Sequence, residues 1–432
     1  MKYPFLLFIW IIATYGIAQS PKAISKSEVV SLALENNNSI KIIAAQVAES
    51  KASFRQSQAV FLPNITASYT GLTTTNPLMA FGSKLNQEII SQNDFNPQFL
   101  NDPERTNNFA TKIEVQQPLL NLDGIFERKA AKAQYQASQM QWERTKDYVA
   151  LEAQKAYMQL QLAYRTVTVL EKAKQAADAN LMLANNSFTQ GYLQKSDVLA
   201  VQVRVNEVEN ELQLAKSNVQ NASNYLSVLI NDDTFEILQP SDSLTVEGIA
   251  PEGVSLSADR ADIKAMEYAS EAYKKMYQSE KMNFLPKLNA FGSYELYDDE
   301  IFQADANGYL VGASLSWNLF EGAQRFAKTQ KSKATFEKSK LELEQYKMES
   351  QVALNQAERM LADAQNSLRL SQLALEQSKE SLRIRTNRFK EGLEKTTDLL
   401  MAETQYAQKE LAYYAAIYQV NYAQLYVQFL SK

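Results

Sequence analysis

Glycine and proline are missing from two very long stretches of this chain, and no other feature restricts its fold as strongly. Neither residue occurs from Ile125 to Gln190 or from Ala323 to Glu391. Each stretch would extend roughly 100 Å as an α-helix, because a helix rises about 1.5 Å per residue. Glycine and proline are the residues that most strongly disfavour a helix interior, so their absence predicts two very long helices.

Both stretches end in the same kind of turn. The first turn runs from Asn186 to Gly191 (Asn-Ser-Phe-Thr-Gln-Gly), and the second from Asn387 to Gly392 (Asn-Arg-Phe-Lys-Glu-Gly). Another stretch without glycine or proline follows each turn, reaching Gln239 in the first case and Lys432 in the second. The sequence therefore predicts two copies of one long helical hairpin.

The duplication extends beyond the turns. Phe61-Leu62-Pro63 recurs as Phe284-Leu285-Pro286, and Asp197 corresponds to Asp398. The spacing between the copies changes by about 20 residues where the first copy carries an insertion at 73–106. The first repeat, 19–250, is expected to contain a leading helix at 26–62, a strand hairpin at 63–120, a long helix at 122–190 and a return helix at 194–231. The second repeat, 251–432, is expected to contain a helix at 259–284, a strand hairpin at 286–320, a long helix at 322–391 and a return helix at 395–430.

The long helices carry a seven-residue repeat of large and small side chains. In the second helix, large residues recur every seventh position from Leu354 to Phe389, and Ala357 and Ala364 lie three positions after large ones. Such a seam is typical of closely packed coiled-coil helices. An antiparallel coiled coil that buries its own stripe and a tube made with other chains both fit this periodicity.

Four segments between the helices have the composition of strands. They are Asn64–Leu72, Phe109–Gln117, Lys287–Tyr297 and Tyr309–Leu319. In the last one, Val311, Ala313 and Leu315 alternate with small and polar residues, as in a membrane barrel with an apolar outside and a polar lumen. A half-buried sheet of a soluble protein gives the same alternation. Four strands cannot close a channel, so a membrane barrel would need strands from several chains.

Composition restricts the chemistry and the compartment. Lys2, the apolar run Phe5–Ile17 and Ala18 form the pattern of a cleaved signal peptide at 1–18, with the mature chain starting at Gln19. The sequence has no cysteine and no histidine, which removes thiol and imidazole nucleophiles, bases and metal ligands. We therefore expect no enzyme activity and no cofactor. A net charge of −5 argues against nucleic acid as a partner.

The order of these motifs resembles that of the TolC-type outer-membrane efflux proteins over nearly all of 19–432. The residues that carry the resemblance are both Phe-Leu-Pro motifs, Leu319-Phe320-Glu321-Gly322 after the last strand, and the paired turns ending at Gly191 and Gly392. The resemblance implies a mainly α-helical fold with a small β part. Three chains would share a twelve-stranded outer-membrane barrel, continuous with a periplasmic helical tube, and the loop 73–106 would lie on the exterior side. This loop is too apolar for a freely solvated one, so an ordered cap packed on its own chain is expected. The alternatives are a loop that folds over or into the barrel mouth and one that contacts another outer-membrane component.

The function implied by the resemblance is passive conduction from the periplasm to the exterior in a tripartite efflux or secretion system. The implied partners are two further copies of the chain, a periplasmic adaptor, an inner-membrane transporter and outer-membrane lipid. Drugs, metal ions and proteins all remain open as cargo. The alternatives are a soluble periplasmic coiled-coil scaffold and an adaptor protein, although an adaptor normally has one hairpin and larger β domains.

The resemblance also assigns roles near the two turns. Asp398 stands where the family places an acidic residue of the entrance constriction, whereas Met401 replaces a second acid. A solvated acid near a helix start is the alternative for Asp398, and local capping is expected for Asp197. Glu394 occupies the position of a gate arginine. The candidate gate contacts are Lys195, Ser196, Asp197, Glu394 and Lys395, and the tip residues expected to face the adaptor are Gly191, Tyr192, Leu193, Gly392 and Leu393.

Overall fold

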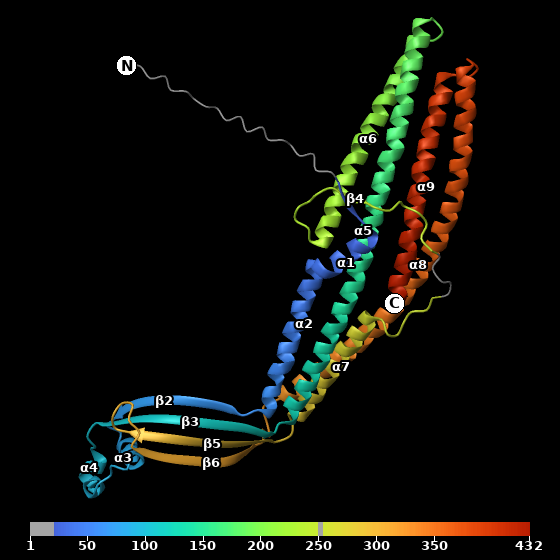
Figure 1. The fold of residues 1–432 in the computed structure, drawn as a ribbon. Helices are drawn as coiled ribbons and strands as arrows, with labels where there is room; N and C mark the ends of the chain where they lie inside the picture. The colour runs from blue at the N-terminus through green and yellow to red at the C-terminus, as the bar shows by residue number, and fades with distance from the viewer. Residues whose placement is uncertain (1–20, 249–253) are drawn as a thin grey trace, which may run out of the picture. The chain divides into compact units, whose positions relative to one another are not determined.

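Two helical hairpins dominate the fold of the chain (Figure 1). A computed structural model describes residues 21–248 and 254–432. Helix α5 (Leu122–Thr189) is followed by α6 (Lys195–Ile230), and α8 (Gln324–Lys390) is followed by α9 (Thr396–Ser431). The expected signal peptide at 1–18 lies outside the described residues. The fold is mainly helical with a small β part, as the sequence predicts.

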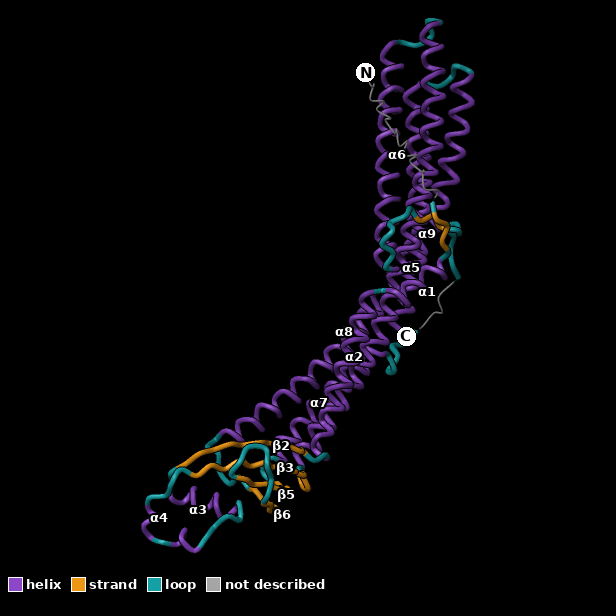
Figure 2. Tube along the Cα trace, turned by 60° about the vertical axis from the view of Figure 1, so that its left-hand side comes forward, coloured by secondary structure: helices purple, strands orange, loops and turns teal. Residues whose placement is uncertain are grey.

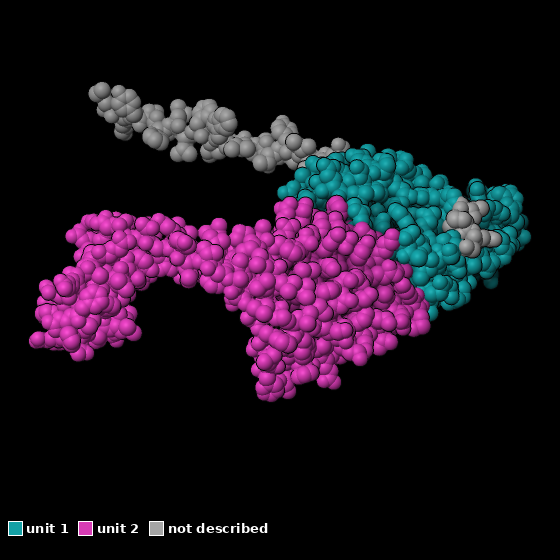
Figure 3. Space-filling view, turned by 90° about the horizontal axis from the view of Figure 1, so that it is seen from below, with its two compact units in different colours: residues 1–42, 143–260, 349–432 teal, residues 43–142, 261–348 magenta. Residues whose placement is uncertain are grey.

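The chain divides into two compact units, and each unit contains segments of both sequence repeats (Figure 3). The first unit contains the residues up to Ile42 together with 143–260 and 349–432. The second contains 43–142 and 261–348. The units therefore do not follow the expected repeat boundary at 250, because α5 and α8 each contribute one part to either unit.

In the first unit, the heptad residues form the contact between α8 and α9. Leu354 and Ala357 are fully buried against Val427 and Leu430 of α9. One heptad further on, Ala364 packs against Val420 and Ala423. The small alanine side chains allow the helix backbones to approach closely, as in other coiled-coil seams. In the first hairpin, Ala184 of α5 likewise packs against Val198 and Val201 of α6.

A short parallel sheet that the sequence did not predict also belongs to the first unit. Strand β1 (Lys22–Ile24) pairs with β4 (Leu238–Pro240). The Tyr157 hydroxyl donates to the Ile24 carbonyl oxygen at 3.2 Å, and the Tyr164 hydroxyl donates to that of Leu238 at 3.1 Å. Two tyrosines of α5 thus hold the ends of both strands.

The leading helix of the first repeat is interrupted, so the expectation of one helix at 26–62 is wrong. Helix α1 (Lys26–Asn36) ends at Asn37, and α2 (Asn38–Gln56) starts immediately after it. The Asn37 side chain donates to the Leu229 carbonyl oxygen at 2.8 Å and accepts from the Ser39 amide at 2.8 Å. A polar contact with the end of α6 therefore fixes the break. A short 3₁₀ helix, η1 (Ser57–Phe61), follows α2.

The second unit contains a four-stranded antiparallel sheet with the order β2-β3-β5-β6. Its strands are β2 (Asn64–Thr74), β3 (Thr106–Leu120), β5 (Lys287–Asp298) and β6 (Ala306–Ser316), and α7 (Ala261–Met282) precedes β5. The last strand ends at Ser316, three residues before the expected end at Leu319. The Asn318 carbonyl oxygen accepts a hydrogen bond from the Arg325 guanidinium at 2.6 Å, so it does not take part in strand pairing.

The insertion at 73–106 is an ordered structure of short helices, in agreement with the expected ordered cap (Figure 2). Helices α3 (Pro77–Asn86) and α4 (Pro97–Asn101) both start with an Asn-Pro pair, and the 3₁₀ helix η2 (Gln92–Phe95) lies between them. Asn76 caps α3 by accepting from the Met79 amide at 3.2 Å. Asparagine at the cap and proline at the first helical position are both favourable choices, so the local sequence stabilises these helices.

Over the two described ranges, we find no helix with an apolar stretch of the length that a membrane crossing requires.

Candidate functional site

The two faces of the four-stranded sheet differ in polarity. The strand register places Ile65, Val115, Gly292 and Val311 side by side on one face. On this face Ile65, Tyr309, Val311 and Leu315 are all more than half exposed. An exposed apolar face of this kind is typical of a surface that contacts lipid or another protein.

The opposite face is mostly polar. Ser68, Lys112 and Glu295 lie side by side on it. The Lys112 ammonium forms ion pairs with Glu114 at 3.1 Å and Glu295 at 3.4 Å. One face therefore suits a hydrocarbon environment and the other suits water, which is the polarity of a transmembrane barrel wall.

Each end of the sheet carries aromatic residues. At the end near α3 and α4, the Tyr69 ring stacks on Phe302 with a centroid distance of 5.0 Å, and its hydroxyl accepts from the Phe302 amide at 2.9 Å. At the other end, the Trp317 indole donates to the Phe284 carbonyl oxygen at 3.0 Å. Aromatic residues with a polar atom are favoured at the two interfaces of a membrane.

The hairpin tips, which belong to the first unit, share one backbone conformation. Gly191 and Gly392 have φ values of +82° and +71°. The amide after each glycine bonds back to the end of the long helix: Tyr192 donates to the Ser187 carbonyl oxygen at 2.9 Å, and Leu393 donates to that of Arg388 at 2.9 Å. This is a helix C-cap that requires a left-handed residue, which explains glycine at both positions.

The acids that follow the two tips have different surroundings. The Asp197 carboxylate accepts from the Gln194 amide at 3.0 Å and thereby caps α6. Asp398 occupies the same position in α9, yet its carboxylate has no hydrogen bond or ion pair within 21–248 and 254–432. The Lys195 ammonium lies 5.6 Å from the centroid of the Phe188 ring.

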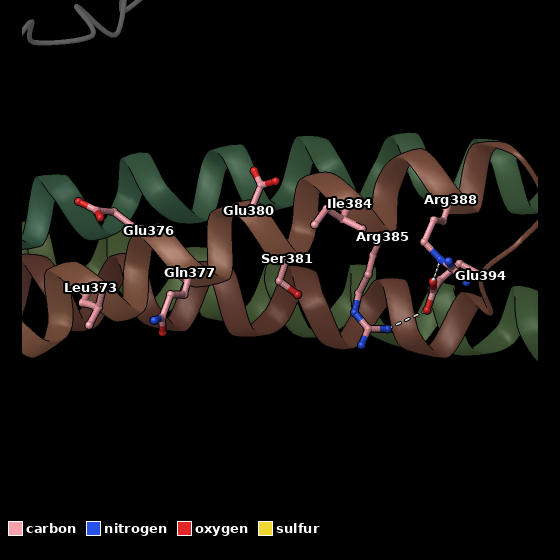
Figure 4. Close-up of a pocket in the computed structure, with 9 residues that line it drawn as sticks. All are labelled: Leu373, Glu376, Gln377, Glu380, Ser381, Ile384, Arg385, Arg388 and Glu394. Carbon is pink, nitrogen blue, oxygen red and sulfur yellow. Dashed lines mark hydrogen bonds and ion pairs between the residues drawn. The ribbon is translucent and has the colours of Figure 1, made fainter.

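Glu394 makes the strongest polar contacts of the second tip (Figure 4). Its carboxylate accepts from Arg385 at 2.7 Å and from Arg388 at 2.8 Å. The Glu394 side chain is only 10% exposed. Hydrogen bonding to Arg388, together with the charge of both arginines, holds the pKa of the Glu394 carboxyl below its usual range. Glu394, at the position where the resemblance led us to expect a gate arginine, therefore links the turn back to α8 through two ion pairs.

Sequence reasoning missed both arginine partners. Arg385 and Arg388 are three residues apart on α8, so they lie on one face of the helix. The turn at Gly392 then brings residue 394 back along that face. The sequence signal that could have predicted these ion pairs is the spacing of two arginines before the turn and one acid directly after it.

A groove runs along α8 towards these ion pairs (Figure 4). Leu373 and Ile384 are exposed to 47% and 45%. The lining residues are Leu373, Glu376, Gln377, Glu380, Ser381, Ile384, Arg385, Arg388 and Glu394. Apolar side chains with charged neighbours make this surface suitable for an amphipathic partner helix.

Contacts between the two hairpins lie beyond the predicted gate residues. Leu400 of α9 packs against the cluster of Ala184 and Val198. One turn further, the Glu403 carboxylate accepts from the Asn180 amide group, and burial raises the pKa of the Glu403 carboxyl. No hydrogen bond or ion pair in the described part of one chain joins Lys195, Ser196 or Asp197 to Glu394 or Lys395. Met401, which stands where the resemblance led us to expect a second acidic residue, is 59% exposed.

Comparisons with known proteins agree with these features. A family model described as outer membrane efflux protein matches residues 29–232 and 254–430. None of the curated proteins compared with the chain matches it. The fold is similar to that of a membrane protein from Pseudomonas aeruginosa, with a TM-score of 0.83 and 18% identity over 94% of this chain and 93% of that one.

Two other solved structures have the same fold. The CmeC outer membrane channel of Campylobacter jejuni has a TM-score of 0.82 at 16% identity and covers 94% of this chain and 85% of its own. The outer membrane protein VceC of Vibrio cholerae has a TM-score of 0.80 at 16% identity, with coverage of 94% and 96%. The helical hairpins and the two-faced sheet thus define an efflux-channel fold. The family match covers most of the chain, which therefore belongs to the outer membrane efflux protein family.

Proposed function

We propose that three copies of this chain form a passive exit duct through the outer membrane. The observation that carries the proposal is the four-stranded sheet with one apolar face, one polar face and two edges, those of β2 and β6, that pair with no strand of the described residues. Unpaired edges are not tolerated in lipid, so a membrane location requires partners for both.

Cyclic assembly supplies those partners. The four strands alternate in direction, so β6 of one copy and β2 of the next copy would run antiparallel. Repeating the sheet around a three-fold axis closes a twelve-stranded barrel without an edge. The apolar face with Ile65 and Val311 would contact lipid, and the polar face with Lys112 and Glu295 would line the water-filled lumen.

The entrance would lie at the hairpin tips, with Asp398 as its constriction. Three unpaired carboxylates around one axis would attract cations and repel one another. Glu394 is held by Arg385 and Arg388 and would keep the adjacent turn closed. The proposed constriction is therefore formed by the acid that is free to contact its symmetry mates. Conduction of this kind requires no catalytic residue and no cofactor.

The proposed partners in the periplasm are an adaptor and an inner-membrane transporter that supplies the energy. Tyr192 and Leu393 are 79% and 66% exposed at the two tips. Exposed large apolar side chains at the tips, together with the groove of Figure 4, favour contact with another protein. The tip positions Gly191, Leu193 and Gly392 would shape the same contact surface.

The experiment that tests this function separates outer membrane from soluble periplasm and measures the native mass of each fraction with and without a mild detergent. The proposal expects a trimer that leaves the outer membrane only with detergent and that forms ion-conducting pores in a planar bilayer. A monomer or dimer extracted without detergent would contradict the proposal and would support the soluble coiled-coil scaffold.

A further inference from the structure

The insertion between β2 and β3 packs on the sheet through one helical face. Three buried residues lie on one side of α3 and its C-cap: Ala80, Ser83 and the C-cap residue Gln87. Their spacing of three and four positions places them on a single helical face. Helix α3 lies against β3 and β6. Figures 1 and 2 show α3 and α4 together at the end of the sheet. The insertion is therefore a fixed part of the second unit.

The strand register identifies the face of the sheet that α3 covers. The Gln87 side-chain amide donates to the Asn108 side-chain oxygen at 2.9 Å and to the Asp298 carbonyl oxygen at 3.0 Å. Asn108 has the same side-chain orientation as Lys112, since side chains alternate along a strand. Thr106 and Ala306, also on this face, are 6% and 1% exposed. Helix α3 thus covers the polar face.

The loop between strands β5 and β6 lies over the opposite face of the sheet. Phe302, between β5 and β6, stacks on Tyr69, whose side chain belongs to the apolar face together with Ile65. Phe302 is 80% exposed. The two hairpin loops at this end of the sheet therefore diverge, one over each face.

Internal contacts make the insertion a folded element. The Lys84 ammonium donates to the Asp94 carboxylate at 2.8 Å, and the other oxygen of Asp94 accepts from the Ser91 amide at 2.7 Å. These hydrogen bonds, that of Lys84 first, lower the pKa of Asp94 to about 2. The Asp94 carboxyl therefore stays ionised well below neutral pH.

The side of the insertion that points away from the sheet is apolar. Leu78 is 81% exposed, and Phe95 and Phe99 are each more than half exposed. Met79, Leu85 and Ile89 are about half exposed. Such a cluster is unusual on a surface that meets only water, so it calls for a covering partner.

We propose that the insertions of the three copies meet inside the exterior mouth of the barrel and form an apolar constriction that limits the passage of hydrated ions. This inference rests on the proposed trimeric barrel. The partner that covers each insertion is thus a second copy of this chain. The register supports this choice because the covered face is the one that the closed barrel turns inward.

Dimensions agree with such a constriction. Barrels of eight strands are filled by side chains and those of about sixteen hold an open aqueous channel, so twelve strands leave an intermediate lumen. Helix α3 is about 15 Å long at 1.5 Å per residue. Three insertions with two short helices each would occupy much of this lumen. Apolar constrictions resist ions because water leaves them easily.

The experiment compares two equally exposed residues on opposite faces of the sheet, Leu78→Asn and Phe302→Asn, by single-channel conductance of the purified protein in planar bilayers. Leu78→Asn should raise the conductance by about twofold or more, because a polar side chain lowers the dewetting barrier. Phe302→Asn should leave the conductance unchanged. Equal effects of both changes, or no effect of Leu78→Asn, would overturn the inference.

A second measurement does not depend on conduction. The chain has no cysteine, so Leu78→Cys and Phe302→Cys each introduce a single thiol per copy. A short bifunctional maleimide should link copies through Cys at position 78 and leave those with Cys at position 302 unlinked. Linking at neither position, or only at 302, would contradict the inference. If the wild-type protein neither assembles nor conducts, the result would instead contradict the proposed function, the trimeric exit duct.

Discussion

The two hairpin tips have the same backbone turn and different side-chain contacts. At the first tip, the acid after the glycine, Asp197, is used to cap its own helix. At the second tip, the corresponding Asp398 has no partner in the described part of the chain, and Glu394 forms the ion pairs that close the hairpin. The tips of a duplicated protein can therefore keep one fold while only one copy leaves a carboxylate free.

This difference separates the conformational role of the tips from their electrostatic role. Gly191 and Gly392 are equivalent because both turns need a left-handed residue. Asp197 and Asp398 are not equivalent because the Gln194 amide donates to the Asp197 carboxylate, whereas the Asp398 carboxylate has no such bond within the described ranges. We therefore assign the proposed constriction to Asp398, and not to Asp197.

The largest effect is expected from Glu394→Arg. The change replaces two charge-assisted hydrogen bonds with three neighbouring cations, which repel one another. Hydrogen exchange of the tip amides at 386–396 should accelerate by roughly tenfold to a hundredfold, measured on the trimer by mass spectrometry. Lys195→Glu, a charge change at the first tip, serves as the control and should leave these amides unaffected. Unchanged exchange in Glu394→Arg would show that the ion pairs do not close the hairpin.

Gly191→Val and Gly392→Val should each destabilise their own turn, and by similar amounts. A β-branched residue in the left-handed region costs about 1–2 kcal/mol. Local opening free energies from hydrogen exchange of the two tips would check this. A cost at only one tip would show that the turns are not equivalent after all.

Alanine at the two acids should separate the tips. Asp197→Ala removes a capping hydrogen bond and should destabilise the start of α6 by about 1 kcal/mol. Asp398→Ala loses only the interaction of a carboxylate with the helix dipole, about 0.3 kcal/mol. In bilayers the order should reverse, since Asp398→Asn is expected to reduce cation selectivity more than Asp197→Asn does. Equal selectivity losses would contradict the assignment of the constriction.

The smallest predicted effect is a pH dependence of the second tip. The pKa of Glu394 is lowered in the folded hairpin, so the stabilisation is complete above the usual glutamate pKa of about 4.3. It is lost as the pH falls through the lower folded value. Exchange of the tip amides, corrected for the intrinsic rate, should therefore rise relative to neutral pH only in acid below about pH 4. Glu394→Gln should abolish this rise, and a rise that persists in Glu394→Gln would have another origin.

Much of the fold could be read from the sequence because its signals are local and long. The absence of glycine and proline from 125–190 and 323–391 marks α5 and α8, and the glycines at 191 and 392 mark their turns. The alternation in 309–315 marks β6. Each of these features depends on residues that are neighbours in the chain.

Features that depend on distant contacts could not be read in this way. The helix break at Asn37 is fixed by the Leu229 carbonyl group, which lies in another helix. The pairing of β1 with β4 involves only three residues on each side, too few for a periodic signal. The side of the sheet covered by the insertion depends on Gln87 reaching Asn108. At the second tip, the resemblance drew attention to position 394 but not to its two arginine partners.

The most direct test of the shared barrel is a pair of cysteines at its proposed seam, with Ile65→Cys in β2 and Leu315→Cys in β6 as starting positions and neighbouring register pairs scanned around them. The background has no native cysteine. Closure of three copies through β2 and β6 predicts disulfide-linked trimers in isolated outer membranes and none in either single variant. Chains that stay unlinked at every register, or that link only within one copy, would contradict the trimeric duct.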